Sequence, residues 1–118
     1  MKKAILLSFI ALTLLFSCKK EKEISVDEVT YEVTLVNSTT WHGSYLNKSA
    51  QIIGITNAPT NWKHTFKNTN NLVVAQLDAY SDGLGVGADA YMKIYVNGTV
   101  VASGQSSISP RVMYIFPY

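Results

Sequence analysis

The chain has 118 residues, with ten Lys and Arg against eight Asp and Glu and a net charge of +2 at neutral pH. This length allows one domain, and without Lys2 and Lys3 the remaining side chains carry eight cationic against eight acidic groups. Because no basic stripe runs through the chain, the charge pattern excludes nucleic acid as a partner.

The first 17 residues have the pattern of a secretory signal peptide. A basic start precedes an apolar run at 4–16, which is shorter than the about 20 apolar residues that a membrane-spanning helix needs. The run ends in Leu15-Phe16-Ser17-Cys18, which resembles the lipobox of bacterial lipoproteins. The resemblance implies signal cleavage between Ser17 and Cys18, and lipidation of Cys18 through a diacylglyceryl thioether and an added acyl chain such as palmitate. A plain signal peptide with an accidental cysteine is the alternative.

Residues 18–28 are predicted to be the lipidated cysteine and a charged tether. They are rich in Lys and Glu and have no hydrophobic periodicity. Lys19-Lys20-Glu21 resembles the export signals of surface-displayed lipoproteins in the Bacteroidota, with a generic charged spacer as the alternative. We therefore expect a cell-envelope protein that is lipid-anchored to a membrane. The outer membrane is favoured, and the domain would face the periplasm or the cell surface. Since Cys18 is the only cysteine, the domain contains no disulfide.

Short β-rich segments begin the domain predicted at 29–118. Apolar and polar residues alternate along 31–35, which indicates a half-buried strand. Strands are also predicted at 41–46, 51–56 and 62–66, and the last of these places Trp62, His64 and Phe66 on one face. The longest predicted strand, at 72–80, has an apolar face made of Val73, Ala75, Leu77 and Ala79, with Gln76 and Asp78 facing away.

The second half of the domain continues this pattern. A glycine-rich loop at 82–87 is followed by a strand at 90–96, with Ala90, Met92, Ile94 and Val96 on one side and Tyr91, Lys93 and Tyr95 on the other. Asn97-Gly98 predicts a type I′ turn that pairs 90–96 with 99–103 as a hairpin. Residues 112–118 form the last predicted strand. With no helical period after residue 28, the pattern predicts an all-β fold, an antiparallel β-sandwich of seven or eight short strands or a small barrel.

No catalytic or metal-binding constellation stands out. His42 and His64 lie in different strands without a carboxylate cluster, so a metal site is not expected, and His64 is expected at the edge of the core. The glycine-rich loop lacks the lysine and helix of a phosphate-binding loop. Asp78, Asp82 and Asp89 do not match an EF-hand spacing. Without a nucleophile elbow or a paired base and acid, we expect no enzyme and no cofactor.

Aromatic residues are the strongest candidates for ligand binding. Tyr91 and Tyr95 flank Lys93 on one strand face and predict an exposed aromatic stripe that could bind a sugar, a peptide or a protein. Trp41 is a third candidate for such an exposed ligand-binding role. The alternative is that these side chains fill the core or cover strand faces.

Three segments in the domain resemble the periplasmic domain of the mycobacterial small membrane proteins (MmpS). Tyr31-Glu-Val-Thr34 is similar to the opening strand of that family, Pro59-Thr-Asn-Trp-Lys63 to a proline-tryptophan-lysine segment, and Lys93-Ile-Tyr-Val-Asn-Gly-Thr-Val-Val101 to a hairpin. The resemblance implies a non-catalytic accessory to a lipid or siderophore exporter. This chain differs in having a lipid anchor instead of an N-terminal membrane helix, and in its aromatic end at 111–118.

The predicted function is therefore a non-enzymatic envelope lipoprotein that binds or scaffolds another component, such as an envelope protein or transporter. The alternative is a surface-exposed module that binds carbohydrate or protein through exposed aromatics. A small hydrolase is a distant third interpretation.

Overall fold

The computed structural model describes residues 26–117. In this part of the chain, residues that alternate between apolar and polar form eight strands. They are β1 (Glu28–Val36), β2 (Trp41–Leu46), β3 (Ile52–Ala58), β4 (Trp62–Lys67), β5 (Val74–Ser81), β6 (Asp89–Val96), β7 (Thr99–Gln105) and β8 (Arg111–Ile115). They form two four-stranded antiparallel sheets, so the predicted sandwich is confirmed. Between residues 26 and 117 there is no helix, and hence none that could cross a membrane.

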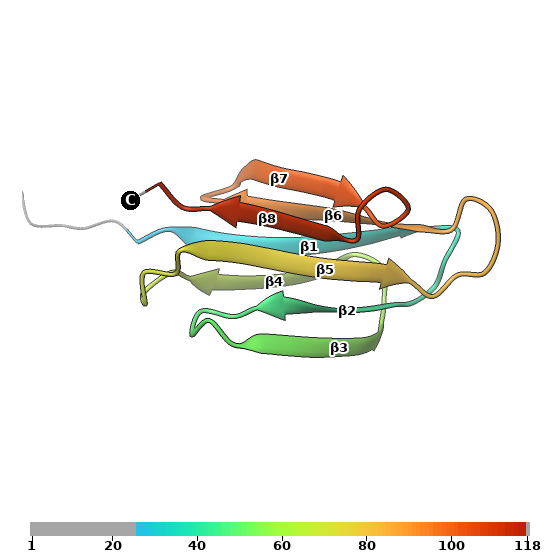
Figure 1. The fold of residues 1–118 in the computed structure, drawn as a ribbon, viewed down its shortest axis with the longest axis horizontal. Helices are drawn as coiled ribbons and strands as arrows, with labels where there is room; N and C mark the ends of the chain where they lie inside the picture. Colours follow the sequence, from blue (N-terminus) through green and yellow to red (C-terminus); the bar gives the residue numbers. More distant parts are fainter. Residues whose placement is uncertain (1–25, 118) are drawn as a thin grey trace, which may run out of the picture.

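The chain crosses repeatedly from one sheet to the other. Sheet A has the strand order β4-β1-β6-β7, and sheet B has the order β3-β2-β5-β8. Only the β2–β3 and β6–β7 connections join neighbours within one sheet. All strands run along the same long direction (Figure 1), with the start of β1 and the end of β8 at one end and the β5–β6 loop projecting at the other. We call these the proximal end and the distal end.

The core lies between the two sheets, on the faces that the alternation predicted. Val29, Tyr31 and Val33 of β1 are buried. The inward residues of β5 and β6, which face each other across the core, are buried as well: Ala75, Leu77 and Ala79 of β5, and Ala90, Met92 and Ile94 of β6. Val73 differs from the prediction and is exposed, because β5 begins only at Val74. The sandwich is thus held by apolar side chains rather than by covalent links.

The predicted Asn97-Gly98 hairpin is confirmed. Both residues have positive φ, 52° and 81°, and Val96 pairs with Thr99 across the turn. The Asn97 side chain also fastens the start of β1, since it accepts a hydrogen bond from the Glu28 amide and donates one to the Asp27 carboxylate. Glu28 is the first residue of β1, so the end of the predicted tether belongs to the folded domain.

Tyr31 connects the two sheets through its hydroxyl. It donates a hydrogen bond to the Leu46 carbonyl at 2.7 Å and accepts one from the Gln76 amide at 3.3 Å. The β2–β5 register ends at Tyr45 opposite Leu77, so the hydroxyl joins the next two residues, one on each strand. Burial is the main reason why the pKa of Tyr31 rises to about 12. A core tyrosine therefore extends the hydrogen bonding of the opposite sheet.

Gly43 permits the close pairing of β2 and β5. A Cβ at this position would collide with the backbone carbonyl of Asp78, because Gly43 lies directly opposite Ala79 next to an irregularity in the β2–β3 pairing. No other residue type fits between these two backbones without moving them.

The predicted signal peptide at 1–17, the lipidation site Cys18 and most of the tether lie outside residues 26–117, as does Tyr118.

Candidate functional site

The predicted aromatic stripe lies on the outer face of sheet A. Met92 and Ile94 of β6 are buried, so Tyr91, Lys93 and Tyr95 point to the opposite side. Tyr91 keeps 40% of its surface exposed. Of the two tyrosines on this face, Tyr91 is the more exposed, because Tyr95 is half-buried.

The Tyr95 hydroxyl donates a hydrogen bond to Glu32 at 3.3 Å. Lys63 of the neighbouring strand β4 approaches the other oxygen of the same carboxylate at 3.3 Å. Glu32 stands opposite Lys93 in the β1–β6 register. Tyr95 is therefore part of a polar row across the sheet, in which its hydroxyl fixes a carboxylate.

The prediction that Trp41 is an exposed ligand-binding residue is wrong. Its side chain is fully buried, its Nε1 donates a hydrogen bond to the Pro59 carbonyl at 3.2 Å, and its ring meets that of Trp62 edge-on at 5.3 Å. Sequence alternation places Trp41 and Tyr45 on one face of β2 but does not say which face is inward. The structure shows that this is the core face, so Trp41 is a packing residue.

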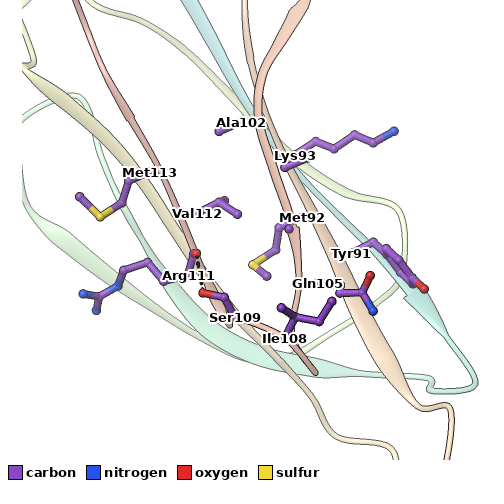
Figure 2. Close-up of a pocket in the computed structure, with 12 residues that line it drawn as sticks. Tyr91, Met92, Lys93, Ala102, Gln105, Ile108, Ser109, Arg111, Val112 and Met113 are labelled. Atoms are coloured by element: carbon purple, nitrogen blue, oxygen red, sulfur yellow. Dashed lines mark hydrogen bonds between the residues drawn. The ribbon is translucent and has the colours of Figure 1, made fainter.

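A groove opens where the edge strands of the two sheets, β7 and β8, face each other. It has a volume of about 700 Å³ and is lined from β6, β7, the β7–β8 turn and β8. Figure 2 shows Met92 and Val112 between the strands, Tyr91 and Lys93 pointing to one side, and Arg111 and Met113 pointing to the other. The groove therefore combines a buried apolar floor with an aromatic and cationic rim.

Gly104 shapes the floor of this groove. A Cβ added there would lie 2.7 Å from a methyl group of Val112, so only glycine lets β7 approach β8 this closely. Ile108, in the turn that follows β7, is largely exposed at the end of the groove. Met113 follows the buried Val112 in β8 and therefore points outward. The groove itself was missed, because no sequence signal shows that β7 and β8 are adjacent edges.

Arg111 on the groove rim is engaged by Asp78. Its Nε and a terminal nitrogen contact the two carboxylate oxygens at 2.8 Å and 3.0 Å. This hydrogen bonding raises the pKa of Arg111, and the nearby negative charge adds to the effect. Asp78 faces away from the core, as predicted, yet it is buried beneath the guanidinium. The pair holds β5 to β8 and fixes the direction of the arginine.

Asp89 is surrounded by donors at the distal end. Its carboxylate accepts hydrogen bonds from the Ser106 hydroxyl, from the Ser107 amide and hydroxyl, and from the Gln105 side chain, at 2.5 to 3.0 Å. Burial alone would raise the pKa of Asp89, but these hydrogen bonds and one from the Ala90 amide outweigh it and lower the pKa to about 2. The carboxylate orders the turn that leads from β7 toward β8.

The two histidines lie apart, on different surfaces. His64 packs among Tyr45, Trp62 and Phe66 at the edge of the core, as expected, and burial lowers its pKa. His42 lies exposed on β2, stacked on Tyr80, with its Nδ1 2.6 Å from an oxygen of Asp82. The structure thus gives each histidine its own structural partners.

Asp82 also accepts a hydrogen bond from the Thr40 hydroxyl, and the hydrogen bond with His42 is the main reason why its pKa is lowered. Asp78, Asp82 and Asp89 therefore have separate partners. Within residues 26–117, no three His, Cys, Asp or Glu side chains gather in a way that could hold a metal ion.

Neither a protein-family model nor a curated protein matches the chain.

Proposed function

We propose that this chain is a non-enzymatic lipoprotein of a bacterial cell envelope, anchored through Cys18, whose sandwich domain binds another envelope component. The β7–β8 groove is the observation that carries the proposal. It combines the buried floor of Met92 and Val112 with the exposed ring of Tyr91 and the aliphatic Ile108. Interfaces favour this combination of apolar centre, aromatic residue and polar rim.

The pairing of three of the carboxylates supports binding over catalysis. Glu32 contacts Lys63 and Tyr95, Asp78 contacts Arg111, and Asp89 contacts the β7–β8 turn. A general base or nucleophile needs an ionisable group that faces a substrate, oriented by a second group. The carboxylates named here instead stabilise neighbouring strands and turns, and the charged rim residues of the groove point away from each other (Figure 2).

The anchor is tested by metabolic labelling. Replacing Cys18 with serine removes the thiol that would carry the diacylglycerol, so we expect an unprocessed precursor without palmitate label. Normal processing of this variant, or an absence of label in the unaltered chain, would refute the anchoring proposal.

The groove is tested by purifying the full chain from envelopes in mild detergent and quantifying the proteins that accompany it. We expect Tyr91→Ala to reduce the yield of the bound component at least fivefold. Tyr80→Ala is the matched control, because Tyr80 has a similar exposed fraction, 45% against 40%, on the other sheet. Equal losses in both variants, or no loss in either, would contradict a binding role for the groove. If the component is an envelope exporter, the accessory role implied by the resemblance to the MmpS family gains support.

A surface-displayed carbohydrate-binding module is the second candidate, favoured by the exposed ring of Tyr91 on a sheet face. Aromatic rings in such positions present a flat apolar surface to a ligand. This candidate requires that protease treatment of whole cells releases the domain, and that a glycan array gives saturable binding weakened by Tyr91→Ala. Protection of the domain from protease, together with an empty array, would eliminate it.

A further inference from the structure

Exposed aliphatic side chains surround the proximal end of the sandwich. Near the strand termini at this end, the exposed fractions are 44% for Val26, 70% for Ile52, 60% for Val73, 45% for Val100 and 67% for Ile115. Ile52 opens β3, Val73 directly precedes β5, and Ile115 closes β8. Because β3, β5 and β8 belong to sheet B while Val100 lies on β7 of sheet A, the apolar residues extend across both layers.

A shallow groove lies within this end. It has a volume of about 470 Å³ between the β2–β3 turn and the β4–β5 connection, and its apolar lining includes Leu46, Ala50 and Val73. Lys48 lies on its rim, and Lys67 ends β4 at the same end. Within residues 26–117 neither lysine forms a salt bridge. Aliphatic side chains beside free ammonium groups match the acyl chains and phosphates at a bilayer surface.

The described part of the chain begins at this same end, with Val26. Under the proposed function, on which this inference rests, Cys18 is in the bilayer and Val26 is eight residues farther along the chain. Eight residues reach at most about 29 Å in any conformation. Since β1 starts at this end (Figure 1), the proximal end lies within about 29 Å of the lipid surface.

We propose that the proximal end of the sandwich rests directly on the phospholipid bilayer that holds the anchor, with Ile52, Val73 and Ile115 in the interfacial layer. This contact sets the orientation of the domain. The nine residues of β1 span about 30 Å at about 3.3 Å per residue. The distal end and the groove rim near Tyr91 and Ile108 therefore lie far from the membrane and are directed toward a partner.

The distal end provides an internal comparison, because it is also apolar. Leu84 and Val86 in the β5–β6 loop are fully exposed, and Ile108 is largely exposed. They lie beyond the far end of β1, where a linker of eight residues could bring them to the bilayer only if the domain folded back along a stretched tether. The two ends therefore have similar chemistry but different access to lipid.

The test uses the full, processed chain in vesicles of phosphatidylethanolamine and phosphatidylglycerol. The Cys18 thiol is consumed by the lipid, so a single introduced cysteine can be labelled with a bimane fluorophore. We expect a nitroxide-labelled phospholipid to quench the label at Val73→Cys or Ile115→Cys at least threefold more than at Leu84→Cys. Equal quenching at both ends, or quenching only at Leu84→Cys, would overturn the proposal.

A second measurement asks whether the aliphatic residues cause the contact. With the label at Ser49→Cys in the β2–β3 turn, the triple variant Ile52→Ser, Val73→Ser, Ile115→Ser should lower lipid quenching at least twofold. The matched variant Leu84→Ser, Val86→Ser, Ile108→Ser should leave quenching unchanged, and an equal effect of the two would count against the proposal.

Vesicle flotation distinguishes a missing anchor from a missing contact between the domain and the bilayer. If the unlabelled chain does not float with the vesicles, the anchor itself is refuted. A chain that floats but shows no lipid quenching at the proximal end refutes only the contact between the domain and the bilayer.

Discussion

Replacing Asp89 with asparagine removes the charge around which the turn after β7 is organised. Asp89 is only 6% exposed, and its two oxygens accept hydrogen bonds from Ser106, Ser107 and Gln105. An asparagine amide keeps one acceptor oxygen and directs a donor group at the Gln105 amide. Since hydrogen bonds to a charged group contribute about 1.5–3 kcal/mol and are not additive, we expect Asp89→Asn to lower the free energy of unfolding at pH 7 by about 2 kcal/mol.

The pH dependence of this loss follows from the pKa of Asp89. The pKa is lowered from 3.8 to about 2, so the ionised carboxylate stabilises the fold at pH values above its unfolded pKa. This stabilisation disappears as the pH falls from about 4 toward 2. At about 1.4 kcal/mol for each pKa unit, discounted for screening by solvent, it amounts to about 1–2 kcal/mol.

The assay is urea denaturation of the purified domain from pH 7 to pH 2, followed by the fluorescence of Trp41 and Trp62. The unaltered domain should lose stability over the acidic part of this range more steeply than the variant, and the difference between them should shrink near pH 2. Glu28→Gln is the control, since this exposed residue should change stability by less than about 0.5 kcal/mol. Equal stability of Asp89→Asn and the unaltered domain at pH 7, or a difference that persists at pH 2, would refute the reasoning.

Two further substitutions test how the sheets are joined, again by urea denaturation. Tyr31→Phe keeps the ring but removes the hydroxyl that joins Leu46 and Gln76, so unfolding should become easier by about 1–3 kcal/mol; an unchanged midpoint would show that this bridge contributes nothing. Gly43→Ala forces a methyl group against the β5 backbone, and we expect a loss above about 3 kcal/mol or no folded protein. Gly54→Ala is its control, because a Cβ at Gly54 meets nothing within 4 Å, and equal losses in the two variants would contradict the packing argument.

Local patterns in the sequence were sufficient to predict most of the strands. Alternation located the inward faces of β1 and β6, because burial on one side of a strand imposes a period of two. Asn97-Gly98 predicted the β6–β7 hairpin, because few residues accept two successive positive φ angles. These signals depend only on residues that are neighbours in the chain, so they hold whichever way the strands are arranged in the sheets.

Long-range pairing could not be predicted in the same way. The partners Asp78 and Arg111 are 33 residues apart, and they meet only because β5 and β8 are neighbours in sheet B. The β7–β8 groove likewise depends on which edges of the two sheets face each other, which the crossing connections leave open. Trp41 was misassigned as an exposed residue for the same reason, since alternation gives a face but not its direction.

The most direct test of the proposed binding role is photo-crosslinking in living cells. A photoreactive amino acid at Tyr91 or Met113 samples the β7–β8 groove, and the same amino acid at the exposed Thr56 on the opposite edge strand β3 samples a surface with no proposed role. Our account predicts one discrete crosslinked product from each groove position and none from Thr56. No product from the groove, or the same product from all three positions, would contradict it.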